Sequence, residues 1–253
     1  MTPRCPVISP LITMGCRTPM VRQTRTMTDP SARPDSERDP TAGDRKSSPA
    51  RAVDGGDAWD ERYAEAEQMW SGEPNAALVA EAGGLEPGSA LDVGCGEGAD
   101  AIWLSVRGWQ VTAIDVSDVA LRRAETAARQ AHAEVEWIHA GLLEAPLPPG
   151  GFDLVCSLYP ALLRTPNHDA ERSLLAAVAP RGHLLVVHHA DVDAKEAKAH
   201  GFDPDDYVWP TDVTSLLDEG WQVTWDERRP RDVHGGAGAG HSHDVVLHAR
   251  RLS

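Results

Sequence analysis

Residues 91–104, LDVGCGEGADAIWL, form an apolar run that breaks at Gly94, Gly96 and Gly98 and then continues with helix-forming residues. Glycine permits a positive φ and lets a ligand approach the main chain, while the amides that open the next helix favour an anion. A strand, a glycine turn and a helix in this order are typical of a site for a nucleotide-like cofactor. More than one cofactor uses such a turn, so the rest of the chain has to distinguish them.

The composition limits the protein classes that fit this turn. Of the 253 residues, 41% are hydrophobic and 25% are charged, which is enough apolar material for one globular core. The formal net charge of -15 disfavours nucleic acid and anionic membranes as partners, because a basic surface drives binding to phosphates. No apolar run reaches the roughly 18 residues of a membrane-spanning helix. The four cysteines show no close pairing, which favours a reducing cytoplasm over a disulfide framework or a zinc site.

Two regions of the chain differ in composition and in hydrophobic periodicity. Residues 1–55 are rich in Pro, Ser, Thr, Arg and Asp and show no hydrophobic period, so we predict a disordered N-terminal extension there. From residue 56 to residue 253, helix and strand signals follow one another, and we predict a single domain. Its first segments, DAWDERYAEAEQMW and EPNAALVAEAGGL, are each typical of a helix.

Seven strands are predicted after these helices, at residues 89–93, 109–114, 134–138, 152–158, 183–188, 221–227 and 244–250. Helical patterns fill most intervals, at about 98–107, 117–131, 168–178 and 211–218. Alternating elements of this kind predict an α/β fold, with a mainly parallel sheet covered by helices on both faces. The last two strands are joined by a Gly/His-rich loop without a helical pattern, so we expect them to pair antiparallel.

Acidic residues beside the glycine turn narrow the choice of cofactor. Asp115 ends the second predicted strand, where a carboxylate can accept hydrogen bonds from both hydroxyls of a ribose. Asp92 precedes the turn and Glu97 lies within it, and their charge suits an ammonium group better than a pyrophosphate. Residues 94–99, GCGEGA, also match the dinucleotide pattern G-x-G-x-x-G/A. A nicotinamide-dependent oxidoreductase is therefore the alternative, and a cofactor-binding protein without turnover is a third reading.

Residues 90–117, ALDVGCGEGADAIWLSVRGWQVTAIDVS, resemble the class I S-adenosylmethionine-dependent methyltransferases, and the resemblance covers about residues 57–252. It implies a Rossmann-like sheet of seven strands in the order 3-2-1-4-5-7-6 with the seventh strand antiparallel. It also implies S-adenosyl-L-methionine as cofactor. Residues 59–75, WDERYAEAEQMWSGEPN, are similar to the branch that includes tellurite-resistance and thiopurine-type enzymes, which implies a small-molecule methyl acceptor.

The resemblance assigns cofactor-binding roles position by position. Asp92 would lie near the ammonium of the methionine part, Asp115 would take the ribose hydroxyls and Val116 would pack on the adenine. After the third strand, where an acidic residue is usual, this chain has Gly141, followed by an apolar residue that can cover the adenine ring. The residues implied to bind the cofactor are Asp92, Gly94, Cys95, Gly96, Gly98, Asp115, Val116, Gly141, Leu142 and Leu158.

Candidates for the chemistry lie at the ends of the fourth, fifth and seventh predicted strands. A sulfonium cofactor carries its own leaving group, so the protein mainly aligns the acceptor, and a base is optional. His189 follows the fifth strand, His243 precedes the seventh, and the predicted order makes these strands neighbours. We therefore predict His189, His243 and Tyr159 as catalytic candidates and no metal site. The alternative is a mobile glycine-rich loop with histidines that only pack on the sheet.

Three aromatic residues in the first helical segment, Trp59, Tyr63 and Trp70, have near-helical spacing. In the resembling family, the helix before the first strand often forms a lid over the cofactor. An aromatic lid would exclude water and attract a sulfonium cation. The alternative is that these side chains only pack in the core.

Overall fold

The computed structural model describes residues 55–199, 202–231 and 241–253. Within these ranges the strands are β1 (Ser89–Val93), β2 (Gln110–Asp115), β3 (Val135–His139), β4 (Phe152–Leu158), β5 (Val178–His189), β6 (Trp221–Pro230) and β7 (His243–Arg251). The helices are α1 (Gly56–Ala64), α2 (Ala76–Ala82), α3 (Ala99–Ser105), α4 (Asp118–Ala131), α5 (Asp169–Ala177), α6 (Ala194–Ala199), the 3-10 turn η1 (Pro204–Asp206) and α7 (Pro210–Thr214). The predicted disordered extension lies outside the described residues except for Gly55.

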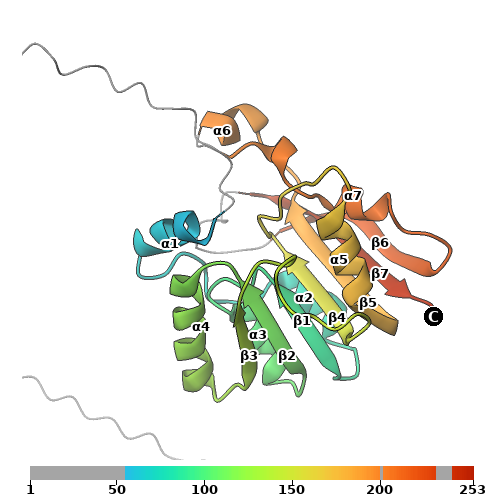
Figure 1. Ribbon diagram of the computed structural model, residues 1–253, viewed down its shortest axis with the longest axis horizontal. Coiled ribbons are helices and arrows are strands. Elements are labelled where there is room, and N and C mark those ends of the chain that lie inside the picture. Colours follow the sequence, from blue (N-terminus) through green and yellow to red (C-terminus); the bar gives the residue numbers. More distant parts are fainter. Residues whose placement is uncertain (1–54, 200–201, 232–240) are drawn as a thin grey trace, which may run out of the picture. The chain divides into compact units, whose positions relative to one another are not determined.

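The seven strands of the described residues form one sheet in the order β3-β2-β1-β4-β5-β7-β6 (Figure 1). Neighbours from β3 to β5 pair parallel, whereas β7 is antiparallel to both β5 and β6. The predicted strand order and the antiparallel seventh strand are thus confirmed. Because β1, β2, β4 and β5 run the same way, their carboxyl ends meet at one edge, which is where open α/β sheets bind ligands.

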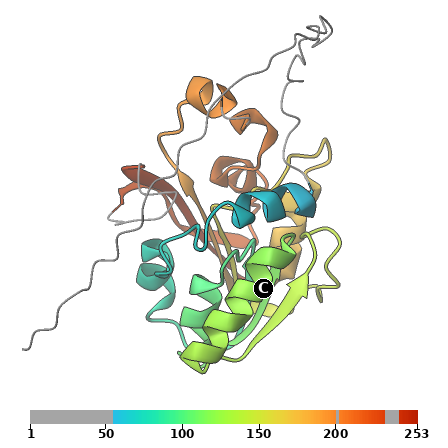
Figure 2. The same cartoon turned by 90° about the vertical axis from the view of Figure 1, so that its left-hand side faces the viewer.

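The two faces of the sheet carry separate cores, because successive side chains of a buried strand point to opposite faces. In β1, Ala90 belongs to the core under α2 and α3, whereas Leu91 belongs to the core under α5 and α7. The residues of β5 alternate in the same way. Helices therefore cover both faces, as predicted (Figures 1 and 2).

Local sequence explains where the helices beside the site begin and end. The hydroxyl of Ser117 accepts a hydrogen bond from Ala120 N at 3.0 Å and caps α4, as serine commonly does. The side chain of Asn75 caps α2 in the same manner, at 2.8 Å from Ala77 N. The apolar stripe of α4 (Ala120, Leu121, Ala124 and Ala128) is buried, and the helix ends at His132 with a φ of 54°.

The structure differs from the predicted elements mainly before β1 and after β5. The first predicted helix runs only to Ala64, since the backbone beyond it is bound by side chains from the glycine turn and from α4. Helix α6 was not predicted, and β5 begins at Val178 instead of residue 183. Across the described residues, no helix is both long and apolar enough to cross a membrane.

Candidate functional site

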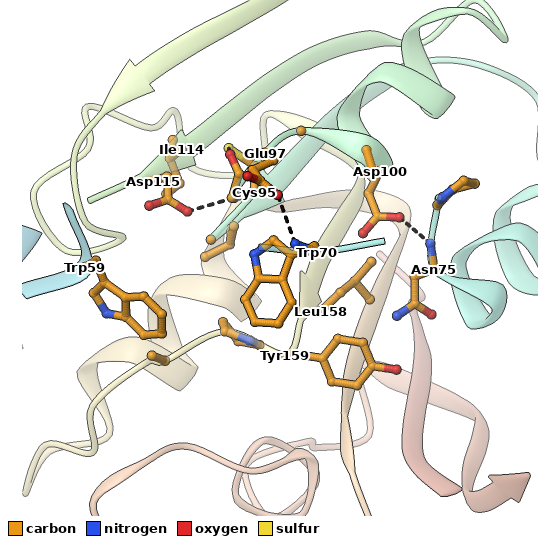
Figure 3. A pocket seen from close by; sticks show the side chains of 18 of the residues that line it. Trp59, Trp70, Asn75, Cys95, Glu97, Asp100, Ile114, Asp115, Leu158 and Tyr159 are labelled. Carbon is orange, nitrogen blue, oxygen red and sulfur yellow. Dashed lines mark hydrogen bonds between the residues drawn. The ribbon is translucent and has the colours of Figure 1, made fainter. Parts of the chain in front are cut away.

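A cavity of about 390 Å³ opens at the carboxyl ends of β1, β2, β4 and β5, in the range of small-molecule sites. Figure 3 shows acidic side chains entering it from the glycine turn and from β2, with Leu158 and Tyr159 on the opposite side. The predicted residues that line it are Trp59, Tyr63, Trp70, Gly94, Cys95, Gly96, Gly98, Asp115, Val116, Gly141, Leu142, Leu158, Tyr159 and His189. Two predicted residues, Asp92 and His243, do not line it.

Four backbone N–H groups of the glycine turn, those of Gly94, Cys95, Gly96 and Gly98, donate hydrogen bonds within the protein. Those of Gly94 and Cys95 donate to Ile114 O at 2.9 and 3.0 Å, and that of Gly98 donates to Cys95 O at 2.9 Å. The N–H of Gly96 donates to the carboxylate of Asp115 at 2.8 Å. A pyrophosphate site needs such donors free to face the ligand. This turn therefore suits close approach of a ligand better than recognition of a pyrophosphate.

The glycines of the turn are required for different reasons. At Gly96, with a φ of 52°, a Cβ atom would lie 2.8 Å from the hydroxyl of Tyr63 and 3.2 Å from Trp70 Nε1. At Gly98 a Cβ atom would meet the ring of Trp137 at 2.7 Å and the methyl group of Ala124 at 2.8 Å. Gly96 thus leaves room over the turn for residues 59–70, which carry Trp59, Tyr63 and Trp70 and are called the aromatic segment below. Gly98 lets α4 and β3 pack against α3.

Two carboxyl groups lie close together near the glycine turn: Asp92, which is buried behind the cavity wall, and Asp100, which is half-buried and lines the cavity. Asp92 is 2% exposed, and its Oδ2 has no hydrogen-bond partner among the described residues. Burial raises the pKa of Asp92, as do the nearby charges of Asp100 and Asp115. Burial also raises the pKa of Asp100 to about 6, although Asn75 N–H donates to it at 2.6 Å. A cationic group in the cavity would relieve this concentration of negative charge.

Asp92 and Asp100 differ in their access to the cavity. Asp92 lies in the middle of the sheet beneath the wall, whereas Asp100, in the first turn of α3, lines the cavity. Sequence reasoning missed Asp100 because it stands after the glycine turn in an ordinary helical segment. The pair together fits an ammonium group, with Asp100 as the direct neighbour.

Asp115 has the position expected of a ribose ligand. Its two carboxylate oxygens accept hydrogen bonds from Gly96 N and Ser117 N, each at 2.8 Å. Burial raises its pKa, and these backbone hydrogen bonds oppose the rise. A carboxylate oxygen can accept more than one hydrogen bond. Asp115 therefore stabilises the glycine turn and can still bind hydroxyl groups in the cavity.

An aromatic segment covers the turn and is held by hydrogen bonds. Trp70 Nε1 donates to the hydroxyl of Tyr63 at 2.9 Å. The carboxylate of Glu97 accepts from Trp70 N at 3.0 Å and from Met69 N at 3.1 Å, and it pairs with Arg123 at 2.9 Å. Figure 2 shows α1 across the end of α4, the helix that carries this arginine. The carboxylate of Glu97 thus holds the aromatic segment in addition to lining the cavity.

The predicted adenine side consists of Val116, Gly141 and Leu142. Leu142 is buried and lines the cavity with the other two. A Cβ atom at position 141 would meet the carboxylate of Glu144, the end of an exposed side chain that can move away. The carbonyl of Val116 accepts a hydrogen bond from His139 Nε2 at 2.9 Å, which fixes this end of β2 beside β3.

The opposite wall carries a polar cluster of Tyr159, His189, Arg231 and Asp244. The hydroxyl of Tyr159 donates to Asp244 Oδ2 at 2.7 Å, and the Tyr159 ring stacks on His189 with centroids 4.3 Å apart. The guanidinium of Arg231 lies 4.9 Å from the centroid of the Tyr159 ring. Tyr159 adopts a φ of 53°, a conformation that non-glycine residues adopt mainly where the surroundings impose it.

His243 is placed away from this cluster. Its Nδ1 lies 2.9 Å from the hydroxyl of Ser242 and 3.5 Å from the carboxylate of Asp191. The histidine that stacks on His189 is His241, at 3.9 Å between ring centroids. The predicted convergence at the ends of β5 and β7 brings His189 beside His241 and Asp244, whereas the candidate His243 lies next to Ser242 and Asp191. Arg231 was not among the predicted residues.

Comparisons with known proteins identify a methyltransferase domain in this chain. The methyltransferase domain family profile matches residues 90–182. An uncharacterised methyltransferase of Mycobacterium bovis is 42% identical over 97 residues, which are 38% of this chain and 48% of the relative. Rat glycine N-methyltransferase is 32% identical over 121 residues, covering 41% of this chain and 40% of the relative. The chain thus spans about half or less of the length of these curated relatives.

Solved structures share the fold at low sequence identity. A protein studied for conversion of a disulfide bond into a thioacetal group during echinomycin biosynthesis has a TM-score of 0.61 at 24% identity, covering 78% of this chain and 92% of that one. A Burkholderia thailandensis 1,6-didemethyltoxoflavin-N1-methyltransferase, solved with its substrate and S-adenosylhomocysteine, has a TM-score of 0.51 at 18% identity over 70% of this chain and 76% of that one.

Proposed function

We propose that this chain, whose residues 90–182 are a methyltransferase domain of the class I S-adenosylmethionine-dependent superfamily, transfers a methyl group from S-adenosylmethionine to a small molecule. One observation carries the choice of cofactor: the acidic pair Asp92 and Asp100 lies under a glycine turn whose amides donate within the protein. This arrangement suits a cationic cofactor end and disfavours a pyrophosphate. The nicotinamide-dependent alternative is therefore the weaker one.

The chain's own residues have distinct roles in this proposal. The glycine turn and Asp100 hold the amino-acid end of the cofactor, Asp115 accepts hydrogen bonds from the ribose, and Val116 with Leu142 covers the adenine. When bound, the cofactor supplies an activated methyl group that leaves with its bonding pair retained on sulfur. The protein then has to orient the acceptor and exclude water, which we assign to Leu158, Tyr159 and the aromatic segment with Trp59, Tyr63 and Trp70.

A small-molecule acceptor agrees with the cavity and with the charge. Trp59, Tyr63 and Trp70 line a cavity of about 390 Å³, a size that suits a small ligand. The net charge of -15 disfavours nucleic acid, and we place the protein in the cytoplasm. The Burkholderia enzyme, named for methylation of a small heterocycle, supports the same class of acceptor.

Isothermal titration calorimetry with S-adenosylhomocysteine and with NAD tests the cofactor directly. We expect S-adenosylhomocysteine to bind at one site and NAD to show no heat of binding, because four amides of the turn donate within the protein and acidic residues surround it. Binding of NAD alone would overturn the proposal. Transfer of a tritiated methyl group to a metabolite pool then separates an enzyme from a protein that only binds the cofactor.

The aromatic segment provides a second test through Glu97. Glu97→Gln removes the charge that pairs with Arg123 and turns one acceptor of the Met69 and Trp70 amides into a donor. Loss of such hydrogen bonds costs about 1–2 kcal/mol, so we expect the Kd of S-adenosylhomocysteine to rise roughly 10-fold in calorimetry. Glu125→Gln is the matched control, because its pair with Arg129 is exposed and 3.7 Å long. Equal affinities for Glu97→Gln and wild type would show that the segment does not cover the cofactor.

A further inference from the structure

Asp244 contacts Tyr159, His189 and Arg231, which form the side of the cavity opposite the glycine turn, called the acceptor wall below. Its Oδ2 accepts the Tyr159 hydroxyl at 2.7 Å and lies 3.5 Å from Arg231 Nε. Its Oδ1 lies 3.4 Å from His189 Nδ1. Both of these last atoms are buried, and neither has a hydrogen-bond partner elsewhere among the described residues. His189 Nδ1 and Asp244 Oδ1 are therefore each available to the other as a hydrogen-bond partner. Hydrogen bonds between catalytic groups are often long in unliganded sites and shorten when a ligand binds.

The ring of His189 is held in a defined plane. Tyr159 stacks on it with centroids 4.3 Å apart at 24°, and His241 stacks on it at 3.9 Å and 11°. The pairing of β5 with β7 places His189 directly opposite Asp244. Since Nδ1 faces this carboxylate, Nε2 is the ring nitrogen left for the cavity that His189 lines.

We propose that His189 and Asp244 form a dyad in which His189 Nε2 accepts the proton of a hydroxyl acceptor and Asp244 positions the imidazole. This inference rests on the proposed methyl transfer and assigns its acceptor class. His189 is the catalytic residue in this scheme, and Asp244 is a positioning residue. An Asp that orients a His through Nδ1 is an established way to select the tautomer of a base.

The charges around His189 agree with a neutral imidazole at pH 7. Burial lowers its pKa, Asp244 opposes this change, and the neighbouring His241 and Arg231 lower the pKa further. His188 lies at 6.1 Å on the same strand, and burial lowers its pKa to about 4, so it adds no charge near neutrality. Burial also raises the pKa of Tyr159, which therefore remains protonated and donates to Asp244.

The proton balance of the step favours a hydroxyl acceptor. The O–H proton moves to His189 Nε2, the oxygen pair forms the bond to the methyl carbon, and the carbon–sulfur pair stays on sulfur. The resulting imidazolium lies beside Asp244 and later releases its proton to solvent. An ammonium acceptor is disfavoured because it would bring another cation to the wall that carries Arg231. A thiol acceptor ionises near neutral pH and therefore needs less help from a base.

Nitrogen-15 NMR of the full chain, labelled at histidine and saturated with S-adenosylhomocysteine, tests the dyad without turnover. The His189 resonance is identified from its loss in His189→Asn. We expect Nδ1 protonated and Nε2 unprotonated at pH 7, and in Asp244→Asn a titration midpoint lower by about one pH unit. Asp226→Asn, an exposed change on β6, should leave the midpoint unchanged. A proton on Nε2, or a midpoint that Asp244→Asn does not move, would overturn the dyad.

Kinetics with 4-hydroxybenzoate, 4-aminobenzoate and 4-mercaptobenzoate as probes test the acceptor class. We expect the hydroxyl probe to be methylated and kcat to fall about 100-fold or more in His189→Asn. In Asp244→Asn we expect the acid limb of the pH profile of kcat to move to lower pH. The Kd of S-adenosylhomocysteine should stay unchanged in both variants. His132→Asn is the control, since His132 is exposed and ends α4 in a left-handed conformation that asparagine tolerates.

The possible failures are distinguishable. Methylation confined to the amino or mercapto probe, or an unchanged rate in His189→Asn, would overturn the assignment of a hydroxyl acceptor. If S-adenosylhomocysteine binds but His189 titrates independently of Asp244, only the dyad fails. If S-adenosylhomocysteine does not bind at all, the proposed function itself fails.

Discussion

Gly96→Ala is expected to weaken the binding of S-adenosylhomocysteine by about 100-fold, because the new methyl group acts on both the turn and the aromatic segment. The φ of 52° at Gly96 disfavours any side chain, at a cost of about 1–2 kcal/mol for an L-residue. The added Cβ would also lie 2.8 Å from the Tyr63 hydroxyl and 3.2 Å from Trp70 Nε1. The Tyr63–Trp70 hydrogen bond must then move away from the turn.

Calorimetry of this variant needs a control for the general effect of replacing glycine. Gly84→Ala serves, because a Cβ atom at Gly84 meets nothing within 4 Å and its φ is not in the left-handed region. We expect Gly84→Ala to retain the wild-type Kd within about twofold. Circular dichroism should show both variants folded at 25 °C. Wild-type affinity in Gly96→Ala would mean that cofactor does not bind between the turn and the aromatic segment.

Asp115→Asn is expected to have a comparable effect for an electrostatic reason. The two carboxylate oxygens of Asp115 accept from Gly96 N and Ser117 N, and asparagine has only one oxygen. Its amide would face one of these N–H groups, and the ribose would lose a charged acceptor. Hydrogen bonds to a charged group contribute about 1.5–3 kcal/mol each, so we expect the Kd of S-adenosylhomocysteine to rise roughly 100-fold.

The same substitution should lower the thermal midpoint of the unliganded protein by several degrees, because a buried backbone N–H loses its partner. Asp118→Asn is the matched control, since its ion pair with Arg122 is exposed and contributes little. That control should retain both affinity and midpoint. If the Asp115→Asn protein has a lower thermal midpoint but binds S-adenosylhomocysteine with wild-type affinity, Asp115 only stabilises the glycine turn and does not bind the ribose.

The fold, the glycine turn and the place of Asp115 beside it could be predicted because their signals are local. The turn at residues 94–98 requires glycine where the backbone takes positive φ, and Asp115 ends the strand that pairs with β1. Both features follow from a strand, a turn and a helix that are consecutive in the chain. The alternation of helices and strands likewise predicts parallel pairing, since each crossover needs a connecting element.

The role of Glu97 could not be predicted because its partners are distant in sequence. Its carboxylate suits an ammonium group by position, yet in the folded chain it accepts hydrogen bonds from Met69 and Trp70 and pairs with Arg123. Only the packing of α1 on α4 brings these groups together. The same holds for Asp100, whose neighbours Asp92 and Asn75 come from a strand and from the segment before α2.

The sequence by itself determined the glycine turn, Asp115 and the convergence of β5 with β7, because these depend on local pattern and on strand order. Only the tertiary structure decided which residue of β7 reaches the acceptor wall. Adjacent residues of a strand point to opposite faces, so a difference of one position separates His243 from Asp244. The antiparallel register sets Asp244 opposite His189, and His243 faces Ser242 and Asp191 instead.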